Sequence, residues 1–161
     1  MRRVAATLVL ALGLPTVAAA ADCAPDRLDI RGAWGQARFK VELADDPDER
    51  ARGLMFRKSL PPTHGMLFIY EHPQHARFWM KNTLVPLDMV FIDPAGRVTA
   101  VHEGAVPGDL TVIDGGTGVL AALEVLAGTV RRFGISVGDQ VRHPAFAPET
   151  AAWPCLLDAA E

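Results

Sequence analysis

The chain has 161 residues, of which 50% are hydrophobic, and a formal net charge of −3 at pH 7. This length and composition suit one domain with its own hydrophobic core. Two of the 16 basic residues and none of the 19 acidic ones precede residue 22, so the rest of the chain has a net charge of −5. A mildly acidic chain without a basic cluster argues against nucleic acid as a partner and against electrostatic binding to anionic membranes.

Residues 1–21 have the features of a secretory signal peptide in the expected order. Arg2 and Arg3 give a basic start, an apolar stretch follows, and small residues lead to a cleavage site expected near Ala20 or Ala21. We therefore expect a periplasmic or secreted protein without membrane insertion after cleavage. The apolar stretch is short for a membrane span, although a retained anchor is the alternative.

Two cysteines, Cys23 and Cys155, lie near the two ends of the exported chain. In an oxidising compartment they are candidates for a disulfide. Such a bond would close a loop of roughly 130 residues and contribute on the order of 4–5 kcal/mol in the chain-entropy model. The alternative is two unrelated thiols. No Cys-x-x-Cys motif supports a redox function.

Residues 22–36 have a weak pattern and are expected to form an N-terminal leader. Apolar side chains then alternate with polar ones over residues 39–43, which predicts a half-buried strand. The run Asp45-Asp46-Pro47 is typical of a helix start, and the predicted helix extends to about Leu54.

From residue 65 onward the pattern is that of short strands with few helices. Strands are predicted at residues 66–70, 78–80, 87–92, 97–102, 119–125 and 140–142, a turn at 93–96, a glycine-rich loop at 114–118 and a helical turn at 128–133. The gaps are too short for helices between parallel strands. We predict a single β-rich domain over residues 37–143, mainly β, of compact sandwich or barrel type with one or two short helices. Residues 144–161 are predicted to form an irregular tail.

Several unusual sequence segments occur in a fixed order along this domain. They are Glu-Arg-Ala-Arg-Gly-Leu-Met-Phe-Arg at 49–57, Gly-Met-Leu-Phe at 65–68, Phe-Trp-Met-Lys-Asn-Thr-Leu-Val-Pro-Leu-Asp at 78–88, Phe-Ile-Asp at 91–93, and Leu-Glu-Val-Leu-Ala-Gly-Thr with Gly-Ile-Ser-Val-Gly-Asp within 123–139. Over about residues 37–142 the chain resembles the bacterial and archaeal family known as domain of unknown function 192. One departure is Ala127, preceded by Leu126, where the family usually has Pro before Ala-Gly. The resemblance implies a compact β-sandwich-type fold, often exported, and no established activity.

Asp88 lies in a predicted strand whose two faces are both apolar, residues 87–92. A buried carboxylate needs a partner, or it becomes neutral. The candidate partners are the cations Arg50, Arg52, Arg57 and Lys81, and Glu49 with Arg50, Arg52 and Asp88 forms the set of structural ion-pair candidates. One interpretation is a polar pocket for a ligand, and the other is an internal ion pair that stabilises the fold.

The candidate binding pocket consists of Arg57, Trp79, Lys81, Asn82 and Asp88. Trp79, next to Met80, suits the wall of a ligand site, although core packing is the more common explanation for such residues. Our hypothesis is a non-catalytic small-ligand-binding or accessory module of the cell envelope, whose partner is a small polar or anionic ligand or an envelope protein. The alternative is a small hydrolase or transferase that uses Asp88 as acid or base beside Lys81 and Arg57.

No cofactor and no metal site are predicted. Four methionines and three histidines (Met55, Met66, Met80, Met89, His64, His72 and His75) are soft ligands that suit copper(I), but they form no cluster in the sequence. Ser136 lies in a Gly-x-Ser-x-Gly match, where a strand should precede and a helix follow a nucleophile. The predicted order is the reverse. The glycine-rich segment at 114–118 lacks the lysine and helix of a phosphate-binding loop.

Overall fold

A computed structural model describes residues 23–155, which form a curled β-sheet with two short helices. The expected signal peptide, residues 1–21, lies outside the described residues. The elements are β1 (Arg27–Gly32), β2 (Gly35–Ala44), α1 (Pro47–Arg52), β3 (His64–Phe78), β4 (Leu87–Ile92), β5 (Val98–Ala105), β6 (Ile113–Leu126), α2 (Thr129–Phe133) and β7 (Gln140–Arg142).

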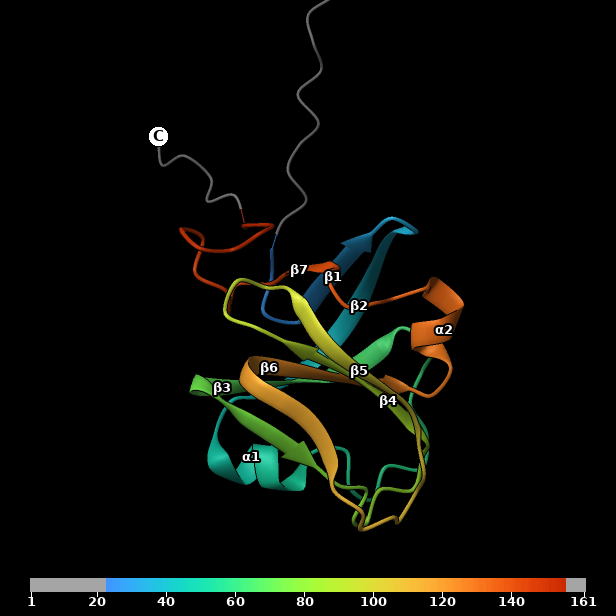
Figure 1. The fold of residues 1–161 in the computed structure, drawn as a ribbon. Coiled ribbons are helices and arrows are strands. Elements are labelled where there is room, and N and C mark those ends of the chain that lie inside the picture. The colour runs from blue at the N-terminus through green and yellow to red at the C-terminus, as the bar shows by residue number, and fades with distance from the viewer. Residues whose placement is uncertain (1–22, 156–161) are drawn as a thin grey trace, which may run out of the picture.

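The seven strands of the described chain lie in one sheet with the order β5-β4-β6-β3-β2-β1-β7. Strands β2 and β3 run parallel, and the other neighbouring pairs run antiparallel. The two outer strands approach each other, because Arg97 and Gln140 form an antiparallel bridge and the amide of Val98 donates to the carbonyl of Asp139 at 2.9 Å. The sheet therefore curls into a half-barrel (Figure 1), which confirms the prediction of a mainly β fold with one or two short helices.

The two faces of the sheet have separate hydrophobic clusters. In β4, Val90 and Ile92 belong to the cluster that also contains Phe39, whereas Met89 and Phe91 belong to the other cluster. All six residues of β4 are buried, as the apolar composition of both its faces predicts. The second cluster, under α1 and the loops that follow it, surrounds the candidate site.

The structure differs from the expectation of a leader at residues 22–36, because β1 begins at residue 27 and pairs with both β2 and β7. Leu28 and Ile30 are buried on one face and alternate with charged residues. The charge of Asp29 hid this pattern in the sequence. Its carboxylate is buried, and Arg38 and Arg142 each donate to it at 2.6 Å.

Strands β3 and β6 are also longer than the sequence indicates. The predicted strands at 66–70 and 78–80 belong largely to one strand, β3, whose register with β6 shifts between Ile69 and Arg77. The predicted loop at 114–118 is the irregular start of β6. Gly115 is required there, because a Cβ atom at this position would lie 2.3 Å from the ring of Phe91.

A disulfide joins Cys23 to Cys155, with Cα atoms 5.8 Å apart, and links positions 132 residues apart in the sequence. The predicted disulfide is therefore present. Between β7 and Cys155 the chain has no helix or strand, although Phe146 is buried in the first cluster. Within residues 23–155, no helix has the length and apolar character needed to span a membrane.

Candidate functional site

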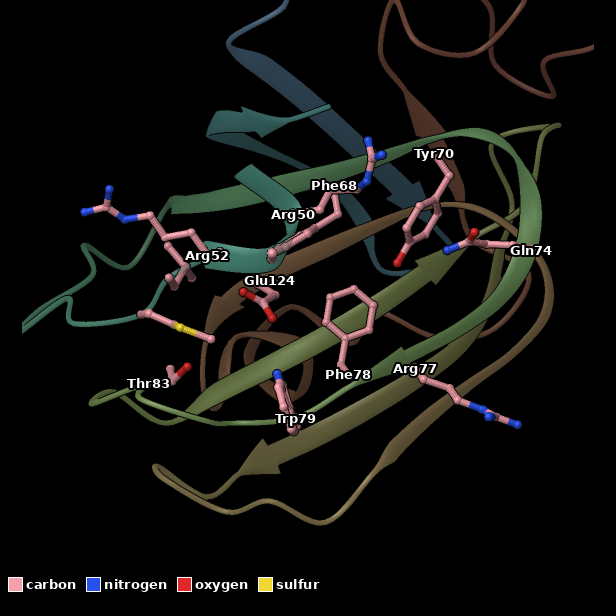
Figure 2. A pocket seen from close by; sticks show the side chains of 14 residues that line it. Arg50, Arg52, Phe68, Tyr70, Gln74, Arg77, Phe78, Trp79, Thr83 and Glu124 are labelled. Carbon is pink, nitrogen blue, oxygen red and sulfur yellow. The ribbon is translucent and has the colours of Figure 1, made fainter. Parts of the chain in front are cut away.

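A cavity of about 360 Å³ lies between α1, β3 and the C-terminal part of β6 (Figure 2). Its lining side chains include Arg50 and Arg52 from α1, Leu54 and Met55 from the loop after it, Phe68, Tyr70, Gln74, Arg77 and Phe78 from β3, Trp79 and Thr83 from the following segment, and Glu124 from β6. Aromatic rings and a few polar groups therefore surround one concave space.

Local sequence features place α1 over this cavity. The side chain of Asp46 caps the helix by accepting from the amide of Glu49 at 2.8 Å, and Pro47 follows in the first turn. The helix ends at Gly53, whose φ of 48° is in the region that favours glycine. A Cβ atom at Gly53 would lie 3.0 Å from the ring of Phe68 and 4.0 Å from Oε2 of Glu124. Glycine thus lets the backbone approach both cavity residues.

The segment 79–83 is held against the loop after α1. The amide of Phe56 donates to the carbonyl of Asn82 at 2.8 Å, and Asn82 itself has a positive φ of 55°. On its other side, the amide of Met80 donates to the carbonyl of Asp109 at 2.8 Å. These bonds set the positions of the neighbouring Trp79 and Thr83 at the cavity.

Glu124 is the most unusual residue of the site. It lies in β6 opposite Met66 of β3 and Met89 of β4, so its neighbours across the sheet are apolar. Only 5% of its surface is exposed. In residues 23–155 its carboxyl group has no hydrogen bond or ion pair with another residue, and its oxygens remain accessible from the cavity. Burial raises its pKa to about 8. At neutral pH the carboxyl group is therefore mostly protonated, and Figure 2 shows it directed into the cavity.

Other polar groups reach the same space. Burial raises the pKa of Tyr70, which stays a neutral phenol at physiological pH, and Figure 2 shows its hydroxyl near the amide of Gln74. Thr83 is buried and presents its side chain from the opposite side. The guanidinium of Arg50 is held by the carbonyl oxygens of Asp45 and Ile69, the latter at 2.8 Å.

The apolar walls are largely aromatic. The rings of Phe68 and Phe78 meet edge to face with centroids 5.1 Å apart, and Phe78 contacts Phe91 in the same way at 5.6 Å. Trp79 is 48% exposed and forms part of the mouth. Such contacts fix the orientation of the rings that line the cavity.

Of the predicted pocket residues, the structure places only Trp79 in this cavity. Lys81 and Asn82 line a neighbouring groove, and Thr83 lines both this groove and the cavity. Arg57 pairs with Glu42 on the other side of the loop after α1. The structure therefore does not bring the five predicted residues together.

Asp88 is fully buried, as predicted, but its expected cationic partner is not observed in the described part of the chain. Its two oxygens accept from the backbone amides of Gly104 and Val130, both at 2.9 Å. Backbone amides at the end of β5 and in α2 supply the hydrogen bonds that we had assigned to an arginine or lysine. The predicted ion pair is thus replaced by two backbone contacts, and Asp88 does not line the cavity.

The remaining ion-pair candidates lie near the cavity but not near Asp88. Arg50 and Arg52 line it, and Glu49 accepts from the amide of Asp45 at 3.3 Å. The motif that contains them therefore forms the cavity wall instead of a salt-bridge network.

The other motifs have local structural roles. His75 contacts Asp114 at 2.7 Å on the surface. The amide of Ser136 donates to Asp139 within a turn. No group of three or more His, Cys, Asp or Glu side chains in residues 23–155 is placed to hold a metal ion.

Sequence reasoning missed Glu124, although a signal for it exists. Glu124 is the single charged residue in the otherwise apolar run 119–126, most of which lies in the strand predicted at 119–125. A buried carboxylate needs a partner, and this holds for Glu124 as it does for Asp88. Unlike Asp88, it has no partner in the described chain.

Comparisons with known proteins agree with the fold. The family model described as DUF192, Uncharacterized ACR, matches residues 29–143. A crystal structure from Sinorhizobium meliloti 1021, described as a "putative transcription regulator", is 43% identical with a TM-score of 0.71, over 74% of this chain and 94% of that chain. A protein of unknown function from Novosphingobium aromaticivorans DSM 12444 is 40% identical with a TM-score of 0.70, over 71% of this chain and 82% of that chain. Among proteins with curated descriptions, none matches. The chain belongs to the DUF192 family.

Proposed function

We propose that this protein is a non-catalytic small-ligand-binding module of the cell envelope, and that the cavity at Glu124 is its binding site. The observation that carries the proposal is the carboxyl group of Glu124, buried and without a partner in residues 23–155, at the base of an open cavity. A carboxyl group with no partner in the protein needs a hydrogen bond from whatever occupies the cavity in front of it, either water or a ligand. A ligand with a matching polar group would supply this hydrogen bond.

The shape and lining of the cavity support the same function. Its volume of about 360 Å³ lies within the range of small-molecule sites. Such sites combine apolar and aromatic walls with a few polar groups that orient the ligand. Here Phe68 and Phe78 are the walls, and Glu124, Tyr70 and Thr83 provide the polar groups.

Export is the second part of the proposal. The signal-peptide pattern of residues 1–21 and the Cys23–Cys155 disulfide both favour an oxidising compartment. Fractionation of cells that produce the tagged full-length chain tests this. We expect the protein in the periplasm or medium with an N-terminus near Asp22. A cytoplasmic protein that retains residues 1–21 would contradict export.

The overall charge of this chain does not favour the regulator description of the Sinorhizobium relative. A nucleic-acid-binding surface needs a concentration of positive charge. Residues 22–161 instead have a net charge of −5.

The geometry of the alternative hypothesis, acid–base chemistry by Asp88 beside Lys81 and Arg57, is not present. Asp88 is buried with both oxygens bonded to backbone amides, and Arg57 is paired with Glu42. A general acid or base must reach its substrate within hydrogen-bond distance. The binding function is therefore the one that the structure supports best.

The test is a thermal-shift screen of small polar, anionic and cationic metabolites against the chain without its signal peptide. We expect at least one class of compound to raise the unfolding temperature, and Glu124→Gln to remove that stabilisation. Glu71→Gln is the matched control, because Glu71 is exposed and does not line the cavity. A screen without stabilisers, or one in which both variants respond like the wild type, would reject the site.

A further inference from the structure

We infer that the ligand carries a positively charged ammonium group, which lies in this cavity against the carboxylate of Glu124 and the surrounding aromatic rings. This inference rests on the proposed function, because it names the chemical class of ligand for the same cavity. It differs from the expectation of an anionic ligand, which relied on cations that the structure places elsewhere.

The lining of the cavity includes three arginines, so the charge that a ligand meets depends on where these side chains point. The guanidinium of Arg50 is bonded to two backbone carbonyls, and Figure 2 shows the guanidinium groups of Arg52 and Arg77 directed away from the centre. Glu124 is the one acidic residue among the described lining residues, and its carboxyl group points into the cavity. An anion in the centre would therefore meet no inward-facing cation, whereas an ammonium group would meet a carboxyl group that pairs with it once ionised.

The walls suit an ammonium group as well. Cations bind over the faces of aromatic rings, and a carboxylate beside such rings strengthens the site. The cavity has four aromatic residues, namely Phe68, Tyr70, Phe78 and Trp79. Two of these rings already have cations of the chain beside them, Arg50 at 5.7 Å from the centroid of Tyr70 and Lys81 at 5.1 Å from that of Trp79.

Binding of an ammonium group requires the ionised form of Glu124, so it is coupled to proton release. The protonated carboxyl group gives its proton to solvent, and the resulting carboxylate pairs with the ammonium ion, which keeps its charge. The side chains that face Glu124 are Met66 and Phe68 from β3 and Met89 from β4, and the titratable or charged groups around it are Tyr70, Arg50, Arg52 and Arg77. Tyr70 stays neutral and the arginines stay charged near neutral pH, so the coupled proton comes from Glu124.

The size of this coupling follows from the pKa of about 8 that burial gives Glu124. At pH 7 only about one molecule in eleven has the ionised carboxyl group, and at pH 9 about ten in eleven do. Because apparent affinity scales with the competent fraction, an ammonium ligand should bind about tenfold more tightly at pH 9 than at pH 7. Close to one proton should be released per ligand bound at pH 7.

The experiment uses three probes of similar shape and different charge: choline, its uncharged isostere 3,3-dimethylbutan-1-ol, and the anion 3,3-dimethylbutanoate. Each is titrated calorimetrically into the chain without its signal peptide, in amine-free buffers at pH 7 and pH 9, and an indicator dye measures proton release in weakly buffered solution. We expect choline to bind at least tenfold more tightly than the isostere, with the pH dependence given above. Glu124→Gln should lose both the preference for charge and the pH dependence, and Glu71→Gln should retain them.

Failure of this inference is distinguishable from failure of the proposed function. If the isostere or the anion binds as tightly as choline, or if choline affinity does not change with pH, the ammonium inference is overturned and the cavity remains a ligand site. If none of the three probes binds, the ammonium inference is overturned. The broader thermal-shift screen then decides whether the cavity binds small molecules at all.

Discussion

Replacing Glu124 with glutamine should stabilise the protein, and the gain should grow with pH. The physical reason is proton linkage. In the folded protein burial raises the pKa of Glu124 to about 8, above the ordinary value of 4.5 that the unfolded chain has. Between these two values the folded state holds a proton that the unfolded state releases, so the free energy of unfolding of the wild type falls as pH rises.

The magnitude follows from the two pKa values. The slope is about 1.4 kcal/mol for each pH unit between pH 5 and pH 8, and it levels off above pH 8. From pH 5 to pH 9 the free energy of unfolding of the wild type should fall by about 4 kcal/mol relative to that of a variant in which residue 124 does not titrate. Glutamine has nearly the same shape and does not ionise, so Glu124→Gln removes this loss while it keeps the packing against Met66 and Met89.

Urea denaturation of wild type, Glu124→Gln and Glu71→Gln at pH 5, 7 and 9 measures the effect. Every other titrating group is shared, so the difference between wild type and Glu124→Gln isolates the linkage of this residue. Glu71→Gln should follow the wild type, because Glu71 is exposed. A difference between Glu124→Gln and wild type that stays constant from pH 5 to pH 9 would refute the reasoning, since it would mean that Glu124 is ionised in the folded protein.

Three further predictions concern the structural elements around the site. Gly53→Ala should lower the free energy of unfolding, measured by urea denaturation, by about 1–3 kcal/mol, and the loss should exceed that of Gly118→Ala. Both glycines have a positive φ, but only at Gly53 would the new Cβ lie 3.0 Å from a phenylalanine ring. Equal losses would contradict the close approach. Asp88→Asn should lower the free energy of unfolding by about 1–3 kcal/mol, because the amide would place a donor against one of the two backbone amides that the carboxylate now accepts from; unchanged stability would show that these contacts contribute little. Cys155→Ser should lower the free energy of unfolding by about 5 kcal/mol, the chain-entropy value for 132 residues. It should also leave a free Cys23 thiol that mass spectrometry detects. A stability equal to that of the wild type under oxidising conditions would argue against a structural bond.

The strands whose apolar residues form uninterrupted or alternating runs were predictable from the sequence. Residues 87–92 are the clearest example. Apolar side chains occur on both faces of this predicted strand, which predicts burial on both sides, and all six residues are buried. The start of the helix near Pro47 was predictable for a different reason, since its capping residue Asp46 acts locally. The hydrophobic pattern and the helix-capping residue, both of which are local in the sequence, therefore account for these elements.

Strand β1 and the start of β6 were not predictable in the same way. In β1 the charge of Asp29 is neutralised by Arg38 and Arg142, and Arg142 is 113 residues away in the sequence. At the start of β6 the glycine-rich segment reads as a loop, and it becomes a strand because it pairs with β3 and lies against Phe91. Contacts distant in the sequence override the local pattern in both cases.

In the site, too, some residues were predictable from the local sequence, whereas others depend on contacts distant in the sequence. The candidate partners of Asp88 come from the two motifs at 49–57 and 78–88, and residues of both motifs line the cavity. Asp88 itself lies elsewhere, and the carboxyl group in the cavity is that of Glu124. A sequence shows that a carboxylate will be buried, but whether backbone amides reach it depends on how loops distant in the sequence close over it.

Asp88 and Glu124 are two buried acids on neighbouring strands, and their different surroundings separate structure from function. Asp88 is satisfied by two amides, so its presence is explained by the fold alone. Glu124 has apolar neighbours across the sheet and no partner in the described chain, and its raised pKa predicts that it lowers the stability of the folded state at neutral pH. A residue that weakens the fold and faces an open cavity is typical of a site where stability is traded for binding. The same substitution, Glu124→Gln, should therefore raise stability and remove ligand binding, and these opposite effects are what a functional carboxyl group predicts and a purely structural one does not.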